Sequence, residues 1–445
     1  MLTDTGEGAL ELAPLRGLRY AGADASALID SPDFNLALAL SPPYDLVDAA
    51  SYARMTRVEP LNAARLTAPP AIDWPDRYTG AARTLRRWVG EGVLVRDPSP
   101  AVYAYEQTTP DGLRQRGLIG LLRLPPPGSG AVRPHEAISE EPVLDRARLM
   151  AATRANLEPI LLLYRGGRGS ERGAASLAAD APAEQGAEPL VDTVTGDGVT
   201  HRLWALTDTR THARIARDLA GRTALIADGH HRYAAYRRLQ ARQCGPGPWD
   251  LGLALLVDSE ASPPRLGPIH RVLPGVDPRA AAEAARAHAR VRELPGGTGP
   301  AGAARLLAEA ARSGPALAVG DRHGFVLIDQ VSAEAMRAAA PDRSEAWRAM
   351  STAALERLLL PLWRTGAEAA ELVHDDPAEA VRRADARPGP AAAVLLPALR
   401  VEDVYAVTAR GELTPRKSTS FGPKPRTGLV LRSLESVPER TDEAR

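Results

Sequence analysis

The chain has 445 residues, of which 44% are hydrophobic, and at ~150 residues per domain this is typical of a globular protein with two or three domains. Lys and Arg together number 55, as do Asp and Glu, so no net charge draws the chain to nucleic acid or to an anionic membrane. The lone cysteine cannot form an intramolecular disulfide, and neither an export signal nor a run of ~18 apolar residues is found, so we expect a cytoplasmic location.

The N-terminal part of the sequence, residues 1–165, predicts an α/β region. The two prolines before Tyr44 stop any helix there, which leaves Tyr44 and Asp45 on an extended loop. The expected elements are strands over 15–20 and 36–40, a helix over 78–92, a hairpin of strands over 101–107 and 118–124, a helix over 145–156 and a buried strand over 157–164.

The remainder of the chain predicts four further segments. Residues 166–200 are rich in Ala, Gly, Glu and Ser, which is typical of a surface insert or linker. We expect a core region over 201–275, with strands over 201–206, 223–227, 250–257 and 268–272 and a helix over 213–220. A C-terminal α/β region over 276–432 is expected to have helices over 278–311 and 345–360 and strands over 324–328, 391–396 and 404–407, before a disordered tail over 433–445.

The most informative segment is a strand-like run that ends in Asp228 and turns on Gly229 into a helix. Glycine permits close backbone approach, and the N-terminus of a helix attracts anions through its N–H groups and its dipole. The histidines and the arginine of the first turn add donors and positive charge. We predict phosphate or nucleotide binding by Asp228, Gly229, His230, His231 and Arg232. The alternative is an ordinary turn with surface imidazoles.

Only two lysines occur in the chain, Lys417 and Lys424, and they lie seven positions apart in an otherwise arginine-based sequence. One interpretation is a proline-bounded loop that tolerates lysine. The other is that an ammonium group is needed there, because arginine cannot replace it as a compact point charge on phosphate. We predict that phosphate contacts come from Lys417, Ser418 and Thr419.

Other polar residues are candidates for catalysis or substrate binding. His135 and Glu136 offer an acid/base pair on a polar loop. Asp45 could be a general base, a magnesium ligand through water, or a cap for the helix that follows. Asn156 could approach a substrate or end a helix as its C-cap, and Asp145 and Arg146 could form either a functional pair or a surface ion pair. A substrate or phosphate contact is also predicted for His270 and Arg271.

The sequence resembles two levels of known families. The Asp228–Arg232 turn is similar to the box that opens the phosphate-binding helix in the ParB/sulfiredoxin-like superfamily, which includes free-serine kinases. A closer resemblance, over nearly the whole chain, is to the family called domain of unknown function 1015. The segments that carry it are 16–20, 42–45, 134–136, 145–146, 153–160, 201–204, 227–233, 270–271 and 417–419. The fold class expected is therefore mixed α/β, with a ParB/sulfiredoxin-like nucleotide-binding core and additional α/β segments.

Three functions follow from these patterns and resemblances. The leading one is nucleotide-dependent phosphotransfer, with ATP, ADP or CTP as the nucleotide, Mg²⁺ as the ion and a small hydroxylated metabolite such as serine or phosphoserine as the partner. A carboxylate, Glu136 or Asp45, would orient the hydroxyl group. The second is a nucleotide- or metabolite-responsive switch without catalysis. A hydrolytic metal site at Asp228, His230 and His231 is the third, but adjacent histidines at a helix start do not easily face one ion, so we predict no protein-held metal.

Overall fold

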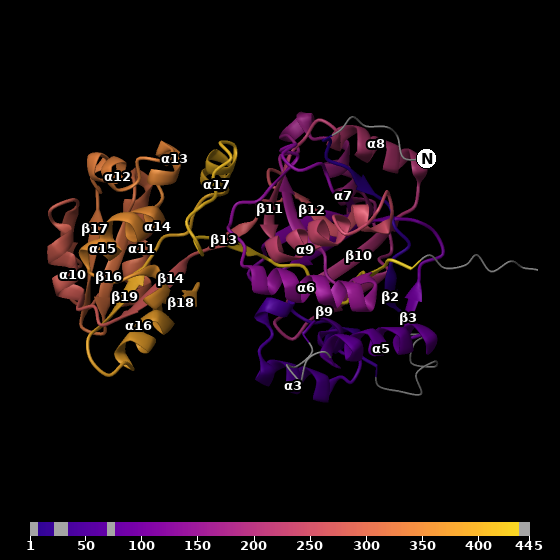
Figure 1. Ribbon diagram of the computed structural model, residues 1–445, viewed down its shortest axis with the longest axis horizontal. Helices are drawn as coiled ribbons and strands as arrows, with labels where there is room; N and C mark the ends of the chain where they lie inside the picture. Colours follow the sequence, from indigo (N-terminus) through magenta and orange to yellow (C-terminus); the bar gives the residue numbers. More distant parts are fainter. Residues whose placement is uncertain (1–7, 22–33, 69–75, 436–445) are drawn as a thin grey trace, which may run out of the picture. The chain divides into compact units, whose positions relative to one another are not determined.

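The computed structural model describes residues 8–21, 34–68 and 76–435, and the chain divides into two compact units (Figure 1). Unit 1 comprises Met1–Arg133, Ile138–Pro263 and Pro423–Arg445. Unit 2 comprises Pro134–Ala137 and Pro264–Gly422. The mixed α/β class is confirmed, whereas the ParB/sulfiredoxin-like core over 201–275 stays a prediction.

Within the described residues, nine strands form the main sheet of unit 1, in the order β6-β11-β8-β12-β5-β4-β10-β9, with β1 paired to β5. The β8–β12 and β6–β11 pairs are parallel, and the other neighbours are antiparallel. The strands are β1 (Leu12–Ala13), β4 (Val102–Thr108), β5 (Arg114–Arg123), β6 (Val132–Arg133), β8 (Ile160–Tyr164), β9 (Val191–Val194), β10 (Thr200–Leu206), β11 (Ala224–Asp228) and β12 (Leu251–Asp258).

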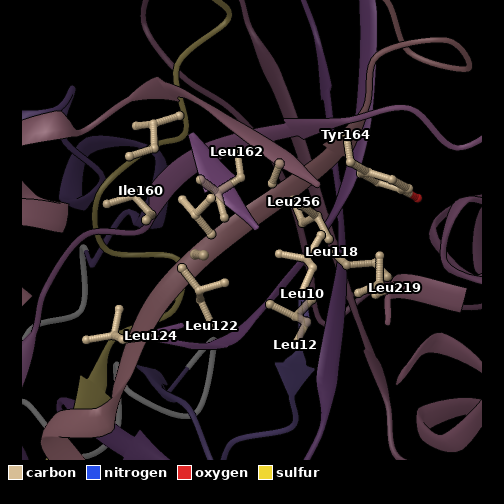
Figure 2. Close-up of a cluster of buried hydrophobic side chains, with 14 of the residues drawn as sticks. Leu10, Leu12, Leu118, Leu122, Leu124, Ile160, Leu162, Tyr164, Leu219 and Leu256 are labelled. Atoms are coloured by element: carbon tan, nitrogen blue, oxygen red, sulfur yellow. The ribbon is translucent and has the colours of Figure 1, made fainter. Parts of the chain in front are cut away.

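A large apolar core holds this sheet and its helices together (Figure 2). Because side chains alternate along a strand, Ile160, Leu162 and Tyr164 of β8 share one core, with Leu219 and Leu256 from other elements. Helices that contribute to it are α6 (Glu140–Thr153), α7 (Ala174–Glu184), α8 (Thr209–Leu219) and α9 (His230–Gln240). The buried strand predicted over 157–164 and the hairpin of β4 and β5 are confirmed.

Shorter elements of unit 1 surround a second core centred on Trp88, which is fully buried. They are β2 (Leu18–Tyr20), α2 (Leu36–Ala39), the 3-10 turn η2 (Tyr44–Leu46), α3 (Ala49–Val58), α4 (Ala64–Thr67), α5 (Asp76–Gly90), β3 (Leu94–Arg96), β7 (Ala155–Asn156) and β21 (Arg432–Ser433). The strand β21 pairs with β7, so the end of the described chain returns to unit 1.

Unit 2 is built on an antiparallel sheet with the order β15-β17-β16-β19-β14-β18. Leu317 and Val394 face one core while their neighbours Ala318 and Ala393 face another, as the two-residue period of strands requires. The strands are β14 (Ile269–Pro274), β15 (Arg290–Glu293), β16 (Leu317–Asp321), β17 (Gly324–Asp329), β18 (Glu371–His374) and β19 (Ala391–Leu395).

Helices and a separate two-stranded antiparallel sheet complete unit 2. The helices are α10 (Pro278–Ala285), α11 (Pro300–Ala310), α12 (Ala333–Ala339), α13 (Glu345–Arg348), α14 (Ser351–Ala354), the π-helical turn η6 (Leu355–Leu359), α15 (Leu360–Leu362), α16 (Pro377–Asp385) and α17 (Val401–Thr408). The strands β13 (Arg265–Gly267) and β20 (Ser420–Gly422) form this two-stranded antiparallel sheet.

Three of the predicted elements are wrong. Residues 36–39 form helix α2, because the Asn35 side chain accepts a hydrogen bond from Ala37 N and caps a helical turn. Residues 401–408 form helix α17, whose start is fixed by hydrogen bonds between Arg400 and Asp403. The stretch predicted as helical over 278–311 contains strand β15, which pairs with β17.

Two segments, one expected as a surface insert or linker and one as a disordered tail, contain regular elements. Residues 166–200, expected as an insert or linker, include α7 and the edge strand β9. The predicted tail begins at Ser433, which pairs with Ala155, while residues 436–445 lie outside the described residues. In the described ranges, none of the helices combines the length and apolarity that crossing a bilayer requires.

Candidate functional site

The turn between β11 and α9 places the predicted phosphate seat at a strand–helix junction of unit 1. Gly229 is the N-cap of α9 and has φ 90°, and a Cβ atom there would lie 2.9 Å from Ile160 Cγ2. Both the left-handed backbone and the close approach require glycine. A register shift between Ile226 and Asp228 interrupts the pairing of β11 with β8, and Asp228, which pairs with Leu161 beyond the shift, ends the strand directly before the helix.

Arg232 braces this turn from within. Its side chain is buried, and it donates to the Pro159 carbonyl at 2.6 Å and to Asp228 Oδ2 at 2.5 Å. Burial lowers its pKa, but Glu158, Asp228 and Asp45 outweigh this effect and raise it. The Nε atom has no acceptor among the described residues. Arg232 thus holds a permanent positive charge under the turn, and direct contact with a phosphate stays a prediction.

Lys424 enters the same site from the C-terminal end of the chain. Its Nζ atom lies 2.7 Å from Asp228 Oδ1 and 2.8 Å from Asp45 Oδ2. Burial lowers the pKa of Lys424, yet Asp228 and Asp45 together raise it above its usual value. We call Asp45, Asp228, Arg232 and Lys424 the lysine cluster of unit 1.

Asp45 is held in place by its neighbour Tyr44. The Tyr44 N–H donates to Glu158 Oε1 at 2.9 Å, and the Thr427 hydroxyl donates to the same oxygen at 2.8 Å. Burial raises the pKa of Asp45, but Lys424 more than compensates, so the net shift is downward. The helix-cap interpretation of Asp45 is wrong, because Asp48 accepts the cap hydrogen bond from Ser51 N. The carboxylate of Asp45 therefore does not cap α3, and its contact in the site is with Lys424.

The two histidines of the turn differ in their surroundings. His230 is buried, whereas His231 is partly exposed. The Ser139 N–H, at the start of α6, donates to His231 Nε2 at 3.3 Å. His231 therefore satisfies part of the N-terminus of α6 in the structure, and phosphate contacts by either histidine stay predictions.

Unit 2 contains a second grouping of predicted site residues, at the loop from Pro415 to Thr419, which we call the lysine loop. His135 Nε2 and Thr419 Oγ1 share a hydrogen bond at 2.7 Å, and Lys417 Nζ lies 3.5 Å from Glu136 Oε1. Ser418 donates its hydroxyl to the Pro415 carbonyl at 2.7 Å, and Lys417 adopts φ 52°. Residues nearly 300 positions apart thus meet within one unit.

The His270–Arg271 pair lies on β14 and is buried. Arg271 Nη2 donates to the Lys417 carbonyl at 2.9 Å, so it supports the lysine loop through its backbone. Leu396 N donates to His270 Nδ1 at 3.2 Å. Burial and the adjacent Arg271 lower the pKa of His270 to about 4, which keeps its ring neutral.

Glu356 lies on the π-helical turn η6, and its raised pKa could not be predicted from the sequence. Burial raises its pKa to about 7, an effect that Arg271 and Arg416 only partly offset. The proximity of this carboxyl group to the lysine loop depends on folding, so no local pattern could have indicated it.

Asn156 has neither an exposed amide nor a capping role. It is buried in β7, and its Oδ1 accepts a hydrogen bond from Arg432 at 2.9 Å. The residue that ends α6 as C-cap is Arg154, with φ 47°, so the C-cap interpretation of Asn156 is wrong. A substrate contact by Asn156 stays a prediction.

The described part of the chain contains no group of three or more His, Cys, Asp or Glu side chains that could hold a metal ion. Asp45 and Asp228 converge on one ammonium group, which provides two carboxylates at most. Mg²⁺ commonly binds one or two carboxylates together with substrate phosphates. The residues therefore fit a Mg²⁺ that arrives with a nucleotide better than a resident metal.

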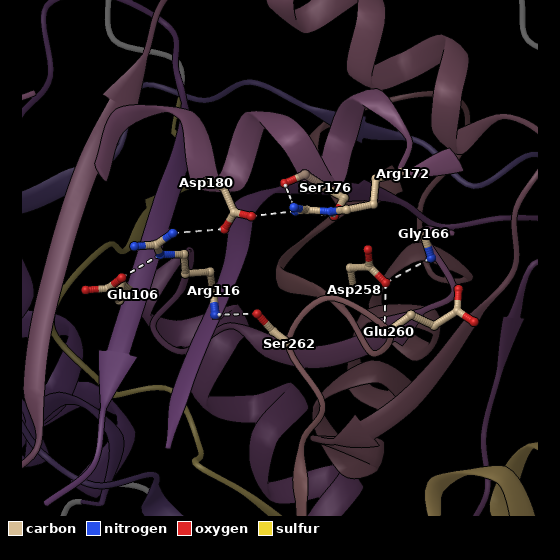
Figure 3. A network of polar contacts seen from close by, with 9 residues as sticks. All are labelled: Glu106, Arg116, Gly166, Arg172, Ser176, Asp180, Asp258, Glu260 and Ser262. Carbon is tan, nitrogen blue, oxygen red and sulfur yellow. Dashed lines mark hydrogen bonds and ion pairs between the residues drawn. The ribbon is translucent and has the colours of Figure 1, made fainter. Parts of the chain in front are cut away.

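A separate polar network of unit 1 lies among β4, β5, α7 and the end of β12 (Figure 3). Arg116 pairs with Glu106 and with Asp180, and Asp180 also pairs with Arg172. The space beside it, about 10 Å³, is of the order needed by one water molecule. This network joins the helix to the sheet and offers no room for a substrate.

Sequence reasoning missed two members of the site. Lys424 was flagged by the rarity of lysine, but the phosphate contacts were assigned to its neighbours in the lysine loop. Thr427 gave no signal, because its role depends on a return of the chain to Glu158.

Together these features define a mixed α/β protein with a charged turn at a strand–helix junction. The chain belongs to the family described as "Protein of unknown function (DUF1015)", whose model matches residues 12–353. This match confirms the resemblance seen in the sequence.

Comparison with other known proteins adds distant similarities. No curated protein matches the chain. A free serine kinase in complex with AMP is 16% identical, with 66% of this chain and 84% of that chain covered and a TM-score of 0.33. SbnI with a C-terminal truncation, from Staphylococcus aureus, is 12% identical, with 71% and 87% covered and a TM-score of 0.33. A conserved hypothetical protein from Pyrococcus furiosus is 16% identical, with 66% and 87% covered and a TM-score of 0.32.

Proposed function

We propose that this protein binds the phosphates of a nucleotide at the N-terminus of α9 and transfers a phosphoryl group between the nucleotide and a small hydroxylated metabolite. Serine as the acceptor, or phosphoserine as the donor in the reverse direction, is the first to test. The observation that carries the proposal is Lys424, whose ammonium group contacts Asp228 and Asp45 beside that helix start. A helix N-terminus and a compact positive charge together favour a phosphate group.

The lysine cluster supplies the groups that phosphoryl transfer needs. Such catalysis depends mainly on positioning and charge stabilisation. The acceptor hydroxyl oxygen would attack the terminal phosphorus of ATP, the bond from that phosphorus to the ADP oxygen would break, and the hydroxyl proton would pass to Asp45. Because the pKa of Asp45 is lowered, this group is a carboxylate at neutral pH and can orient the hydroxyl. Mg²⁺ would offset phosphate charge.

A nucleotide- or metabolite-responsive switch is the second candidate. It is favoured by the pairing of Asp45 with Lys424, since a carboxylate already bound to an ammonium group is a poor proton acceptor until a ligand separates the two. In this case, ligand binding would separate Asp45 from Lys424 and change the conformation of the cluster without any turnover. ATP, ADP and CTP remain the nucleotides to compare.

The residues predicted in unit 2 remain candidates in the same proposal. Glu136 and His135 are alternative acid/base groups, and Lys417, Ser418 and Thr419 are alternative phosphate contacts. The role proposed for Lys424 does not depend on them.

Calorimetric titration with ATP, ADP and CTP, with and without Mg²⁺, tests the proposal. Lys424→Met should weaken the tightest nucleotide by roughly tenfold or more, because it removes a charge-assisted contact. Lys417→Met, the change of the only other lysine, is the matched control and should have the smaller effect.

A turnover assay separates the two candidate functions. Incubation with ATP and serine should yield phosphoserine and ADP in equal amounts, and Asp45→Asn should abolish both. Nucleotide binding without any product would favour the switch. No binding of any of the three nucleotides to the unmodified protein would contradict both.

A further inference from the structure

A large cavity in unit 1 belongs to no function described so far. It has a volume of about 1360 Å³ and lies among α3, α4, α5 and α6. Its lining includes the five arginines Arg57, Arg65, Arg77, Arg146 and Arg148. Apolar and aromatic side chains such as Val47, Tyr52 and Leu144 form other parts of its wall. Concave sites that combine apolar walls with a few charged groups are typical of small-molecule binding.

Two sequence segments whose roles were left open meet at this cavity. The guanidinium group of Arg146 lies 3.9 Å from the centroid of the Tyr44 ring. Arg146 also donates to the Thr67 carbonyl at 2.6 Å and pairs with Asp145. The Asp145–Arg146 segment thus fixes the ring of the residue that precedes Asp45. The cavity wall and the lysine cluster are therefore connected through adjacent residues.

Two of the four carboxylates that line the cavity, Asp145 and Glu140, pair with arginine side chains. Asp145 accepts contacts from Arg146, Arg77 and the Tyr78 hydroxyl. Asp48 caps α3 by accepting from Ser51 N at 2.7 Å. Asp48 and Glu141 complete the acidic part of the wall, so its five arginines outnumber its four carboxylates.

Some of the positive charge is less well satisfied. Arg65 donates from Nη2 to the Thr56 carbonyl at 3.0 Å, and its buried Nε has no acceptor among the described residues. A carbonyl does not neutralise a guanidinium charge. Arg57, on the neighbouring helix, is exposed and lines the same cavity. The arginine side of the cavity therefore favours an anion, and guanidinium groups bind carboxylates and phosphates in a bidentate manner.

We infer that this cavity binds a small organic anion, with its phosphate or carboxylate group on Arg57 and Arg65 and its apolar part against Tyr52 and Leu144. The inference deepens the proposed function, because Tyr44 lines the cavity and Asp45 follows it: the anion is the phosphoryl acceptor. The identification of the anion as the phosphoryl acceptor rests on the proposed function, whereas the existence of the binding site does not.

Calorimetry of the full chain without nucleotide tests the site, with O-phosphoserine and phenyl phosphate as the two probes. The first probe has a polar substituent and the second an apolar ring, so their ranking reports what the wall prefers. Arg57→Gln combined with Arg65→Gln should weaken the better probe at least roughly tenfold. Ala53→Trp, at an exposed position that lines the cavity, should do the same by filling space without removing charge. Arg242→Gln, at an exposed position after α9, is the control and should leave affinity unchanged.

The inference is overturned if neither probe binds the unmodified protein, or if both cavity variants bind as well as the control does. ATP titrations of the same variants separate it from the proposed function. Probe binding that depends on the cavity arginines, with no nucleotide binding, would support the cavity and refute phosphotransfer. Nucleotide binding without probe binding that depends on the cavity arginines would refute the cavity as an anion site and would still support the nucleotide site.

Discussion

The two lysines of the chain occupy contrasting environments in the two units. In unit 1, the Lys424 side chain is 19% exposed and lies within 2.8 Å of two carboxylates. In unit 2, the Lys417 side chain is 49% exposed and lies 3.5 Å from one carboxylate, Glu136. The first lysine is part of a buried charge network, and the second belongs to a loop whose backbone is held by Arg271.

Two lysines only seven positions apart in the sequence therefore contribute differently to stability. A partly buried ammonium group between two carboxylates is fixed in position, and its removal leaves like charges facing each other. An exposed ion pair contributes little to stability and leaves the lysine available to a ligand. Four substitutions test this contrast.

Arg232→Met should destabilise unit 1 by about 3–5 kcal/mol, because it leaves Asp228 in a partly buried site without its guanidinium partner. Peptide-resolved amide hydrogen exchange over β11 and α9 measures this effect in unit 1 alone. Arg238→Met in the same helix, where the pair with Glu140 is exposed, should cost at most about 1 kcal/mol. Equal losses for the two variants would remove the distinction between buried and surface charge.

Glu356→Gln should stabilise unit 2 by about 3 kcal/mol at pH 8, since the pKa is raised from 4.5 to about 7 and one pKa unit corresponds to about 1.4 kcal/mol. The pKa of Glu356 in the folded protein is about 7, above its ordinary value, so the ionised form disfavours folding. Stability of the unmodified protein should therefore fall as pH rises from about 4.5 through 7 and then level off. The advantage of the variant should vanish near pH 4. A pH-independent advantage, measured by hydrogen exchange over η6, would refute this assignment.

Lys424→Met should cost unit 1 about 1–2 kcal/mol near neutral pH, a figure that allows for solvent screening at the partly exposed Asp45. The pKa of Asp45 is lowered, so its contribution is present above about pH 4 and is lost as pH falls further. The pKa of Lys424 is raised, so its contribution is present below about pH 10 and is lost as pH rises further. The difference between unmodified protein and variant should therefore form a plateau between these limits. A difference that peaks outside the plateau would rule out this pairing.

Lys417→Met should change the stability of unit 2 by no more than about 0.5 kcal/mol, because the lysine is half exposed and its pair is long. The positive φ of Lys417 is unchanged by this substitution, so backbone strain does not enter the comparison. Hydrogen exchange over the lysine loop is the measurement. A loss above about 1 kcal/mol would place Lys417 in the same class as Lys424.

The sequence predicted the elements with strong local patterns. The hairpin of β4 and β5, the buried strands β8, β12 and β19, and the strand–glycine–helix junction at Gly229 all follow from periodicity and turn chemistry. Short apolar runs gave wrong predictions: strands were predicted over 36–40 and 404–407, but side-chain hydrogen bonds at the starts of α2 and α17 make these segments helical. Such caps compete with β propensity and are decided by a single side-chain orientation.

The charge network of the site was only partly predictable. Asp45 and the Asp228–Arg232 turn were identified from the prolines and from the glycine junction. Their connection through Lys424 spans 379 residues on one side, and no local rule gives a contact of that range. The division of the candidate residues between two units was also not apparent, since residues 134–137 join unit 2 from within the sequence of unit 1.

The order of segments in the chain constrains how the protein is made. Unit 1 receives its last part, including Lys424 and Arg432, only after all of unit 2 has been synthesised. A nascent chain released up to Gly422 therefore contains every segment of unit 2 but lacks the ammonium group that joins Asp45 to Asp228. The lysine cluster is therefore completed only at the end of translation, and a chain that terminates before residue 424 lacks the ammonium group between Asp45 and Asp228.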